Sequence, residues 1–326
     1  MQSRSTLICF AAAVFAAAGG SVGSAAANGW FHDRAPELQA TESVSVEPFL
    51  GYLRGTSGES VYDPANPKSK VSQLDWTVNA LAVGARVAAR PFEHLSIRGR
   101  FWATVASDGG MADYDWFGGY FGKGSWTHKS DHPDTDLGKA WQADISAAFA
   151  YFAEDDVALT AIAGYRRYDV KYKARGGSYV YSTGGFRDTI GSFTPGQIGI
   201  AYEQSWDVPY FGLGANWNGD SWAVSAELIG SPFVTSRDRD YHALRTTLFK
   251  GDFDMSGMVG ASLGVEYRFT QMVSLAGRFE YQRYLEAKGS TRIFEGTTGT
   301  ALAIPKPSAG AEADTLLLSL GIKARL

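Results

Sequence analysis

The chain ends in Leu316-Leu317-Leu318-Ser319-Leu320-Gly321-Ile322-Lys323-Ala324-Arg325-Leu326. Its even-numbered positions are all apolar, whereas the odd-numbered positions turn polar toward the end of the segment. Successive side chains of a β-strand point to opposite faces, so this segment has one apolar face and one polar face. Lys323 and Arg325 cannot face hydrocarbon cheaply. The segment therefore predicts a membrane-spanning strand whose odd-numbered side chains point into the lumen of a barrel.

The same alternation recurs upstream, where Ile97, Phe101 and Val105 share one face and Arg98 and Arg100 share the other. This pattern predicts that both arginines enter the lumen. Further candidate strands are Trp141 to Tyr151, Val157 to Tyr165, Val259 to Tyr267 and Val273 to Tyr281. We expect an all-β protein, a transmembrane antiparallel β-barrel of about ten strands, which is an even number within the range of bacterial barrels.

Composition favours one barrel domain over two smaller soluble domains in this chain of 326 residues. Aromatic residues make up 13% of the chain and glycine occurs 38 times, while the mean hydropathy is only −0.15. Beyond the N-terminus the sequence holds no apolar run long enough for a spanning helix. Barrel strands alternate between polar and apolar residues, so their average hydropathy stays low.

The N-terminus predicts export, because Arg4 precedes an apolar stretch from Leu7 to Ala18 and a run of small residues. We expect residues 1–27 to be a signal peptide cleaved after Ala27, with cleavage near Ala25 fitting almost as well, and residues 28–326 to form the barrel. Cys9, the only cysteine, lies in the removed segment. Loss of Arg4 takes the formal charge from −4 to about −5, which argues against nucleic acid as a partner.

Connections between the expected strands fall into a short class and a long class. Short ones include Arg90 to His94 and Phe269 to Met272. Long polar ones are Gly55 to Lys70, Asp108 to Gly138, Lys173 to Gly196, Ser231 to Asp254 and Glu286 to Asp314. Barrels of bacterial outer membranes carry tight turns on the periplasmic side and larger loops outside. We therefore expect long extracellular loops and an outer-membrane location.

Two acidic clusters lie in these long segments. Asp113 and Asp115 are two residues apart, as are Asp240 and His242, so each pair shares one face if its backbone is extended. Neighbouring carboxylates raise each other's proton affinity, and a carboxylate can orient an imidazole for proton transfer. The residues thus favour a site that activates water. Taken alone, an Asp-x-Asp pair is most often part of a solvated loop or a weak cation site.

Two other chemistries compete for these residues. Three aspartates and one histidine could ligate a cation, but the sequence has no paired-histidine spacing and we expect no metal. Ser130 and His132 resemble part of a serine nucleophile site, yet a spacing of two residues does not make a triad. We expect these two residues, and Asp134, to line or support the site.

Several strings in order strengthen the interpretation that this site activates water. They are Glu59-Ser60-Val61-Tyr62, Val71-Ser72-Gln73-Leu74-Asp75-Trp76, Asp113-Tyr114-Asp115, His132-Pro133-Asp134-Thr135, Ala174-Arg175-Gly176-Gly177-Ser178-Tyr179 and Asp238-Arg239-Asp240-Tyr241-His242. With these strings the chain resembles the omptin family of outer-membrane aspartate and histidine endopeptidases. The resemblance implies ten strands and four catalytic residues, Asp113, Asp115, Asp240 and His242. His242 and Asp113 would share the attacking water, Asp240 would orient His242, and no covalent intermediate or cofactor is needed.

The resemblance also implies how the substrate is chosen. Glu59 and Asp238 match the acidic pair that holds an Arg or Lys side chain before the scissile bond, so polypeptides with basic residues are the expected partners. Members that cut between two basic residues carry an acidic residue where this chain has His128. We expect His128 to contribute a second substrate subsite with altered selection after the bond.

Lipid binding is where the sequence departs from the family. Members bind lipopolysaccharide through basic groups on the outer wall and need it for activity. Here Tyr165 matches the motif, but Asp169 and Ser205 stand where Arg is expected. Arg166 and Arg167 supply charge from shifted positions, or the partner lipid differs; both alternatives stay open.

A second function class fits the same fold. A barrel of this kind could act as an adhesin or invasin, binding extracellular proteins through its loops without hydrolysis. An adhesin has no need for a converging carboxylate and imidazole site, so the residues favour the endopeptidase.

Overall fold

The computed structural model describes residues 44–119 and 121–326. The chain divides into the units Met1–Leu38 and Gln39–Leu326, and every described residue belongs to the second. The predicted signal peptide, residues 1–27, and Cys9 therefore lie outside the described residues. In the described part, none of the helical segments combines the length and apolarity needed to cross a bilayer.

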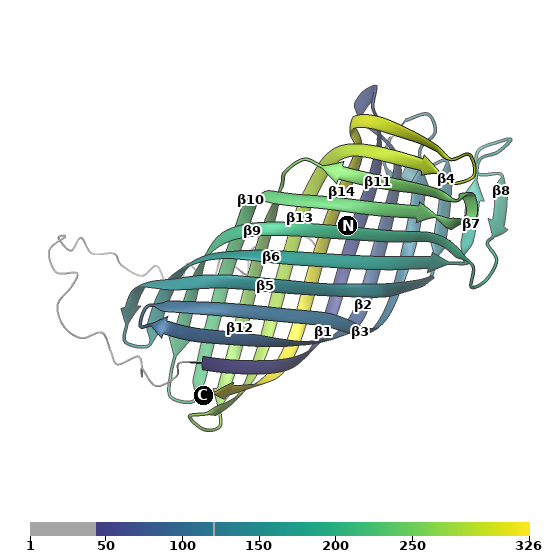
Figure 1. The fold of residues 1–326 in the computed structure, drawn as a ribbon. Helices are drawn as coiled ribbons and strands as arrows, with labels where there is room; N and C mark the ends of the chain where they lie inside the picture. Colours follow the sequence, from purple (N-terminus) through teal and green to yellow (C-terminus); the bar gives the residue numbers. More distant parts are fainter. Residues whose placement is uncertain (1–43, 120) are drawn as a thin grey trace. The chain divides into compact units, whose positions relative to one another are not determined.

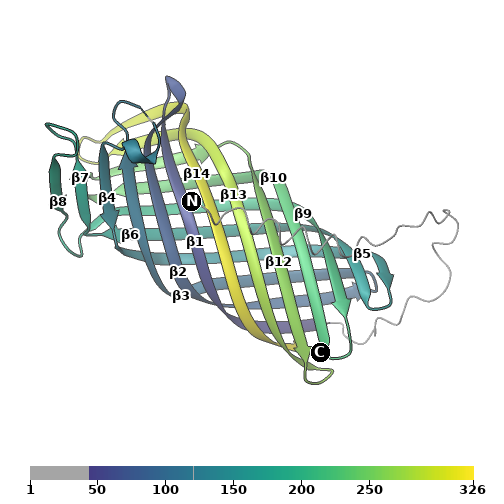
Figure 2. The same cartoon turned by 180° about the vertical axis from the view of Figure 1, so that it is seen from behind.

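The unit Gln39–Leu326 is a closed antiparallel barrel, as the sequence predicts (Figures 1 and 2). Its strands are β1 (Val44–Asp63), β2 (Asn66–Phe92), β3 (Leu95–Asp115), β4 (His128–His132), β5 (Asp134–Glu154), β6 (Val157–Arg175), β7 (Ser178–Tyr181), β8 (Thr189–Ser192), β9 (Ile198–Asn218), β10 (Trp222–His242), β11 (Thr247–Phe253), β12 (Ser256–Arg268), β13 (Val273–Glu295) and β14 (Thr300–Arg325). Two 3-10 turns, η1 (Lys123–Ser125) and η2 (Ala243–Arg245), complete the elements of the described residues. The first and last strands pair along their length, from Ser45 with Arg325 to Val61 with Ala309, and this pairing closes the ring.

The described residues form 14 strands, more than the predicted number of about ten. Ten of them pair in order around the closed ring of the barrel, as predicted: β1, β2, β3, β5, β6, β9, β10, β12, β13 and β14. Two strands of the ring are each broken in two, because β3 pairs with both β4 and β5 and β10 pairs with both β11 and β12. Pro133 separates β4 from β5, and proline has no N–H for the ladder. A bulge in β10 around Pro232 faces the break between β11 and β12. The remaining two, β7 and β8, form a hairpin on the edge of β4.

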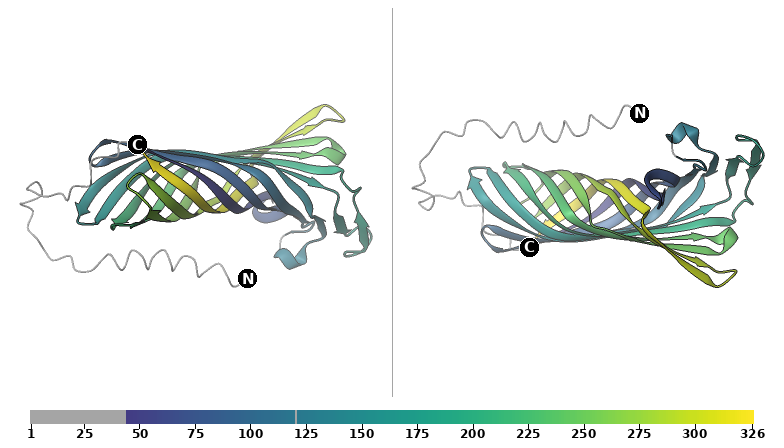
Figure 3. Two further views of the ribbon diagram at one scale, coloured as in Figure 1. Left: turned by 90° about the horizontal axis from the view of Figure 1, so that it is seen from below. Right: turned by 90° about the horizontal axis from the view of Figure 1, so that it is seen from above.

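The expected long loops are mostly strand, which corrects the second part of the prediction. The ladder between β1 and β2 continues to Asp63 and Asn66, and that between β13 and β14 continues to Glu295 and Thr300. A strand of about 10 residues suffices to cross a bilayer, whereas β1 has 20 residues and β10 has 21. About half of each long strand therefore rises beyond the membrane, where polar side chains on both faces look like a loop in the sequence. Figure 3 shows these extensions diverging at one end of the ring.

The predicted facing of the last strand is confirmed. Leu318, Leu320 and Ile322 are exposed on the outer wall, whereas Ser319 and Arg325 are buried in the lumen. Short turns join β2 to β3, β5 to β6, β9 to β10 and β12 to β13 at the end of the ring opposite the acidic clusters. The period-two signal thus gave the correct side for each residue of this segment.

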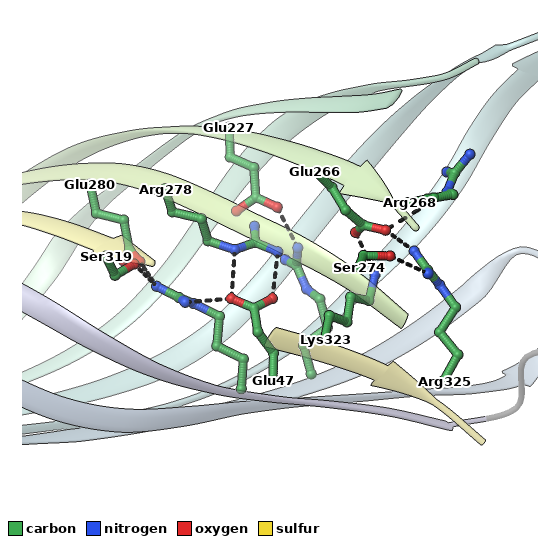
Figure 4. A network of polar contacts seen from close by, with 12 residues as sticks. Glu47, Glu227, Glu266, Arg268, Ser274, Arg278, Glu280, Ser319, Lys323 and Arg325 are labelled. Atoms are coloured by element: carbon green, nitrogen blue, oxygen red, sulfur yellow. Dashed lines mark hydrogen bonds and ion pairs between the residues drawn. The ribbon is translucent and has the colours of Figure 1, made fainter. Parts of the chain in front are cut away.

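Charged side chains fill the lower lumen and pair with one another (Figure 4). Glu47 accepts from Arg86 at 2.7 Å and from Arg278 at 3.2 Å, and Glu280 accepts from Arg86 at 2.6 Å. Arg100 also pairs with Glu280, as the sequence predicted for a lumen arginine. Buried charges are tolerated only when they are paired. This network makes the lower barrel a solid support for the end that carries the acidic clusters.

Figure 4 shows further pairs of the same kind nearer the final strand. Arg98 pairs with Glu227, Lys323 reaches Glu266 at 3.0 Å, and Arg325 donates to Ser274 at 2.6 Å. The lysine and arginine of the last strand therefore avoid lipid, as expected.

Aromatic rings occupy the lumen above the charged network. Trp76 stacks between Tyr172 and Tyr202, with ring centroids 5.2 Å and 5.3 Å away. Trp206 and Tyr284 pack with centroids 5.0 Å apart. These rings fill the lumen below the acidic side chains at the open end of the barrel.

Candidate active site

The two acidic clusters lie on strands that face each other across the open end of the barrel. Asp113 and Asp115 belong to β3, where they pair with Leu74 and Ser72 of β2. Asp240 and His242 belong to β10, between β9 and β11. The prediction of extended backbone at both clusters is confirmed, so each pair presents its side chains to one face. Ladder bonds on both sides hold these positions, which a free loop would not do.

Asp240 and His242 contact each other directly. His242 Nε2 lies 2.5 Å from Asp240 Oδ2, and Asp240 is only 2% exposed. The imidazole packs edge-on against Phe249, with centroids 5.2 Å apart. Asp240 Oδ1 is buried without a hydrogen-bond partner among the described residues. A carboxylate fixed in this way holds the imidazole in one orientation.

The surroundings of Asp113 and Asp115 favour the protonated form of both carboxyl groups. Burial raises the pKa of Asp113 well above its usual range, and the charges of Asp115 and Asp240 raise it further. Ser72 opposes this shift by donating a hydrogen bond to Asp113 Oδ1 at 3.4 Å. Burial also raises the pKa of Asp115, against the hydrogen bond of Ser72 and the charge of His242. The charge of Asp240 acts on Asp113 and that of His242 acts on Asp115, as expected of side chains that face each other across one mouth, the open end of the barrel.

Glu59 of β1 and Asp238 of β10 form a second acidic group in the same mouth. Glu59 is 7% exposed, and its Oε2 has no hydrogen-bond partner among the described residues. Burial raises the pKa of Glu59 well above its usual range, and the charges of Asp240, Asp238 and Asp113 add to it. Two buried carboxylates with spare acceptor capacity suit a cationic guest, which would offset their mutual repulsion.

Asp238 is held by its neighbours more firmly than Glu59. It accepts hydrogen bonds from the Gly251 N–H at 2.8 Å and from the Tyr202 hydroxyl at 3.2 Å. Burial raises the pKa of Asp238 to about 7, partly opposed by the Gly251 N–H and increased by Asp240. A side chain at position 251 would collide with Asp238, since a Cβ there would lie 2.4 Å from Oδ1. Glycine is required at this close approach.

His128 lies beside Asp115, its ladder partner across β3 and β4. Its ring packs against Phe117 and Tyr181, with centroids 4.7 Å and 4.9 Å away. Its Nδ1 contacts the Thr127 hydroxyl at 3.1 Å. The position predicted as a second subsite is therefore an aromatic-walled surface next to the acidic pair.

Ser130 and His132 make a hydrogen bond of 3.0 Å, and both are buried. His132 Nδ1 has no hydrogen-bond partner in the described part of the chain, so no carboxylate completes a triad. The His132 ring instead stacks on Phe193 at 5.1 Å. Asp134 lies exposed at the start of β5. Both residues belong to β4, and the supporting role expected for them stays a prediction.

The predicted lipid contacts separate to opposite sides of the wall. Tyr165 is exposed and donates to Asp207, and Arg167 pairs with Asp169 at 2.7 Å and Asp207 at 2.8 Å. Arg166 is buried in the lumen and bonds Asp144 at 2.8 Å. The expectation that Arg166 supplies charge to the outer wall is wrong, because period two places it opposite Tyr165.

Sequence reasoning assigned no role to Ser72, Tyr202 or Arg245. Ser72 and Tyr202 hydrogen-bond the acidic side chains described above, and the charge of Arg245, in η2, lowers the pKa of Asp113 and Asp115. Ser72 lies in a string already singled out, but its partner depends on the register between β2 and β3. Within residues 44–119 and 121–326, no group of three His, Cys, Asp or Glu side chains is arranged to hold a metal ion.

Known proteins share both the fold and the sequence pattern. The crystal structure of outer membrane protease OmpT from Escherichia coli matches with a TM-score of 0.83 at 28% identity, covering 88% of this chain and 98% of that chain. Outer membrane protease OmpP of Escherichia coli (strain K12) is 32% identical over 270 residues, which is 82% of this chain and 85% of the relative. The plasminogen activator of Yersinia pestis is 29% identical over 286 residues, 87% of this chain and 90% of the relative.

The fold and these relatives define a protease built as an outer-membrane β-barrel, with polypeptides as substrates. Residues 40–326 match the Omptin family, and the chain belongs to that family. The resemblance seen in the sequence is confirmed.

Proposed function

We propose that this protein hydrolyses peptide bonds after Arg or Lys, using a water activated between the Asp113 and Asp115 pair and the Asp240 and His242 pair. The observation that carries the proposal is the 2.5 Å contact between His242 Nε2 and Asp240 Oδ2 in a mouth shared with Asp113. Such an imidazole is a general base, and a carboxyl group with a raised pKa is a general acid.

The proton positions follow from these contacts. When His242 Nε2–H donates to Asp240, Nδ1 remains to accept a proton from water. The water oxygen bonds to the peptide carbon while that proton moves to Nδ1. The surroundings of Asp113 raise its pKa well above the usual range, and in its protonated form it donates a hydrogen bond to the carbonyl oxygen as negative charge develops there. Collapse of the tetrahedral intermediate breaks the C–N bond, and the imidazolium returns its proton to the leaving amine. Asp115 holds Asp113 in its protonated form.

Selection of a basic side chain before the bond rests on Glu59 and Asp238. Both are buried, and Glu59 Oε2 has no partner among the described residues. A guanidinium or ammonium group supplies hydrogen bonds and positive charge together. The Trp76 and Tyr202 stack beneath them offers an apolar wall to the alkyl part of the same side chain.

The direct test is cleavage of a quenched fluorescent peptide with one central Arg by the refolded barrel, with and without lipopolysaccharide. We expect a single cut after Arg. We further propose that lipopolysaccharide has little effect, because Arg167 is already paired with Asp169 and Asp207 and a lipid phosphate must compete with both. A large gain in rate on adding lipopolysaccharide contradicts this part alone.

Affinity for a basic substrate should depend on pH through Asp238. Its pKa is raised to about 7, so it is neutral below that pH and cannot pair with a cation. We expect KM for an Arg peptide to rise several-fold as pH falls from 8 to about 6. The Asp238→Asn variant should lose this dependence in KM, whereas Asp252→Asn, at an exposed position on β11, should keep it. Identical pH profiles of KM in the wild type and Asp238→Asn would contradict the assignment.

His128 should set the preference after the scissile bond. Phe117 and Tyr181 flank it, and Lys129 follows it in the chain, so we expect apolar or aromatic side chains to be accepted and basic ones disfavoured. Profiling a peptide library that varies the residue after Arg measures this. The His128→Asp variant should gain about tenfold for a basic residue there, since an opposite charge favours it by roughly 1 kcal/mol or more. A wild-type requirement for basic residues on both sides of the cut would refute the prediction.

One observation favours binding as a second function. Phe117, Phe121, Phe186 and Ile190 are exposed near the tips of the outer strands, Phe121 by 84%. Exposed aromatic side chains are frequent at protein interfaces. If a folded barrel cleaves no Arg peptide with or without lipopolysaccharide, an adhesin becomes the better interpretation.

A further inference from the structure

The outer wall carries an apolar groove on the side formed by β1, β2, β12, β13 and β14. Its volume is about 550 Å³, and its walls include Leu50, Tyr52, Val265, Phe279, Leu318 and Leu320. All of these except Phe279 are strongly exposed on the outer face. The groove lies on a different arc of the ring from Tyr165 and Arg167, which belong to β6.

A glycine creates the groove. Gly277 of β13 pairs with Leu320 of β14 and Val265 of β12. Of these three neighbouring outward positions, the two outer ones carry large side chains and the middle one carries none. A Cβ added at Gly277 would meet nothing within 4 Å. Leu320 is 57% exposed beside it. The missing side chain therefore leaves a channel between two apolar ridges, wide enough for a hydrocarbon chain to lie against backbone.

The groove ends at a polar rim on the side of the active site. Tyr52 contributes its ring to the wall of the groove and donates its hydroxyl to Asn79 at 3.1 Å. Arg54 follows two residues later on the same face of β1, about 7 Å farther toward Glu59. The outward face of β1 is apolar from Val44 to Tyr52, so Arg54 marks the point where the apolar band stops.

Arg54 is available to a ligand. It is exposed, and none of the hydrogen bonds or ion pairs of the described residues involves it. Its outer-face ladder neighbours are Leu316 and Asn79. Two outward carboxylates lie in the neighbouring ladders: Asp314 pairs with Thr56 and accepts its hydroxyl hydrogen bond, and Asp108 of β3 pairs with Asn79. A cation without a carboxylate partner at the edge of an apolar groove complements an anionic amphiphile.

We propose that this groove is a binding site for one anionic phospholipid, with an acyl chain along Gly277 and the headgroup phosphate against Arg54. The acyl chain buries apolar surface of the two ridges, and the phosphate accepts from the guanidinium. The site requires neither the active site nor the outer wall of β6, so it stands apart from the proposed hydrolysis.

Native mass spectrometry of the barrel in detergent tests the site. Phosphatidylglycerol and phosphatidylcholine with identical acyl chains are offered in equal amounts, and glycerol 3-phosphate serves as a headgroup without chains. We expect the wild type to retain one phosphatidylglycerol in preference to phosphatidylcholine. Arg54→Gln should reduce this preference on the order of fivefold, the value of one interfacial cation near an anionic headgroup. Gly277→Leu should reduce retention of both lipids.

The variants carry their own controls. Arg239→Gln removes another exposed outward arginine, on β10 and outside the strands that line this groove, and should leave the preference unchanged. Gly277→Leu has open space for its Cβ, so it should fold, and a shift in gel mobility on heating confirms closure of each barrel.

The proposal is overturned if Arg239→Gln acts as strongly as Arg54→Gln, if Gly277→Leu retains lipid as the wild type does, or if glycerol 3-phosphate displaces the lipid.

Discussion

Replacing His242 by Ala is expected to lower kcat on an Arg peptide by at least about a thousandfold, because positioned acid and base groups contribute factors of roughly a hundred to ten thousand each. Asp113→Ala should fall to a similar level, since it removes the group that donates a hydrogen bond to the carbonyl oxygen as negative charge develops there. The double variant should be little worse than either, because the two act on one transition state. KM should change far less than kcat in all three.

Matched controls separate this loss from a folding defect. His94→Ala and Asp220→Asn change the same residue types in the turns at the opposite end of the barrel and should keep wild-type kcat. A His242→Ala barrel that is folded and retains more than about a tenth of the wild-type kcat would remove His242 from the mechanism. Retention of activity by Asp113→Ala, with loss in His242→Ala, would leave a histidine base acting without its partner across the mouth.

The second large effect is expected from Asp238→Asn combined with Glu59→Gln. Removing the partners of a buried charge typically weakens binding by about 2 to 5 kcal/mol, so kcat/KM for an Arg peptide should fall by about thirtyfold or more. Asp238→Asn should preserve the local ladder, since the amide oxygen of the new side chain can accept from the Gly251 N–H in place of the carboxylate oxygen. The kcat/KM of the double variant for a peptide with Leu before the scissile bond should equal that of the wild type.

The ratio of the two substrates is the measurement that decides. Glu59→Gln alone and Asp238→Asn alone should each reduce the preference for Arg over Leu, with Asp252→Asn as the exposed control. If both peptides lose activity equally in the double variant, Glu59 and Asp238 support the structure of the mouth and do not select the substrate.

Period two accounts for most of what the sequence predicted correctly. It placed Lys323 and Arg325 inside the lumen and Leu318 and Leu320 on the outer wall, and it placed Asp113 with Asp115 and Asp240 with His242 on shared faces. The same rule, applied to Tyr165, would have shown that Arg166 points inward. That prediction failed because it considered the charge of Arg166 and not which face of the strand its position occupies.

Other features have no signal along the chain. Strand continuation above the membrane leaves polar residues on both faces, so the segments around Gly58 and Asp314 looked like loops although they are paired strands. The count of strands depended on breaks after His132 and Phe253, which interrupt a ladder without changing its neighbours. Contacts such as Ser72 with Asp113 and Tyr202 with Asp238 depend on register between strands, which alternation alone does not determine.

The closure of β1 onto β14 also bears on when this protein can act. Asp113 and His242 stand on separate arcs of the ring, with β5, β6 and β9 between them on one side and β11, β13, β14, β1 and β2 on the other. In a newly exported chain, Asp113 and His242 lie on segments that are not yet paired in a sheet. The two residues come together only after the first and last strands have paired. Under the proposed chemistry an unassembled chain has no complete active site, so activity begins only when the barrel closes.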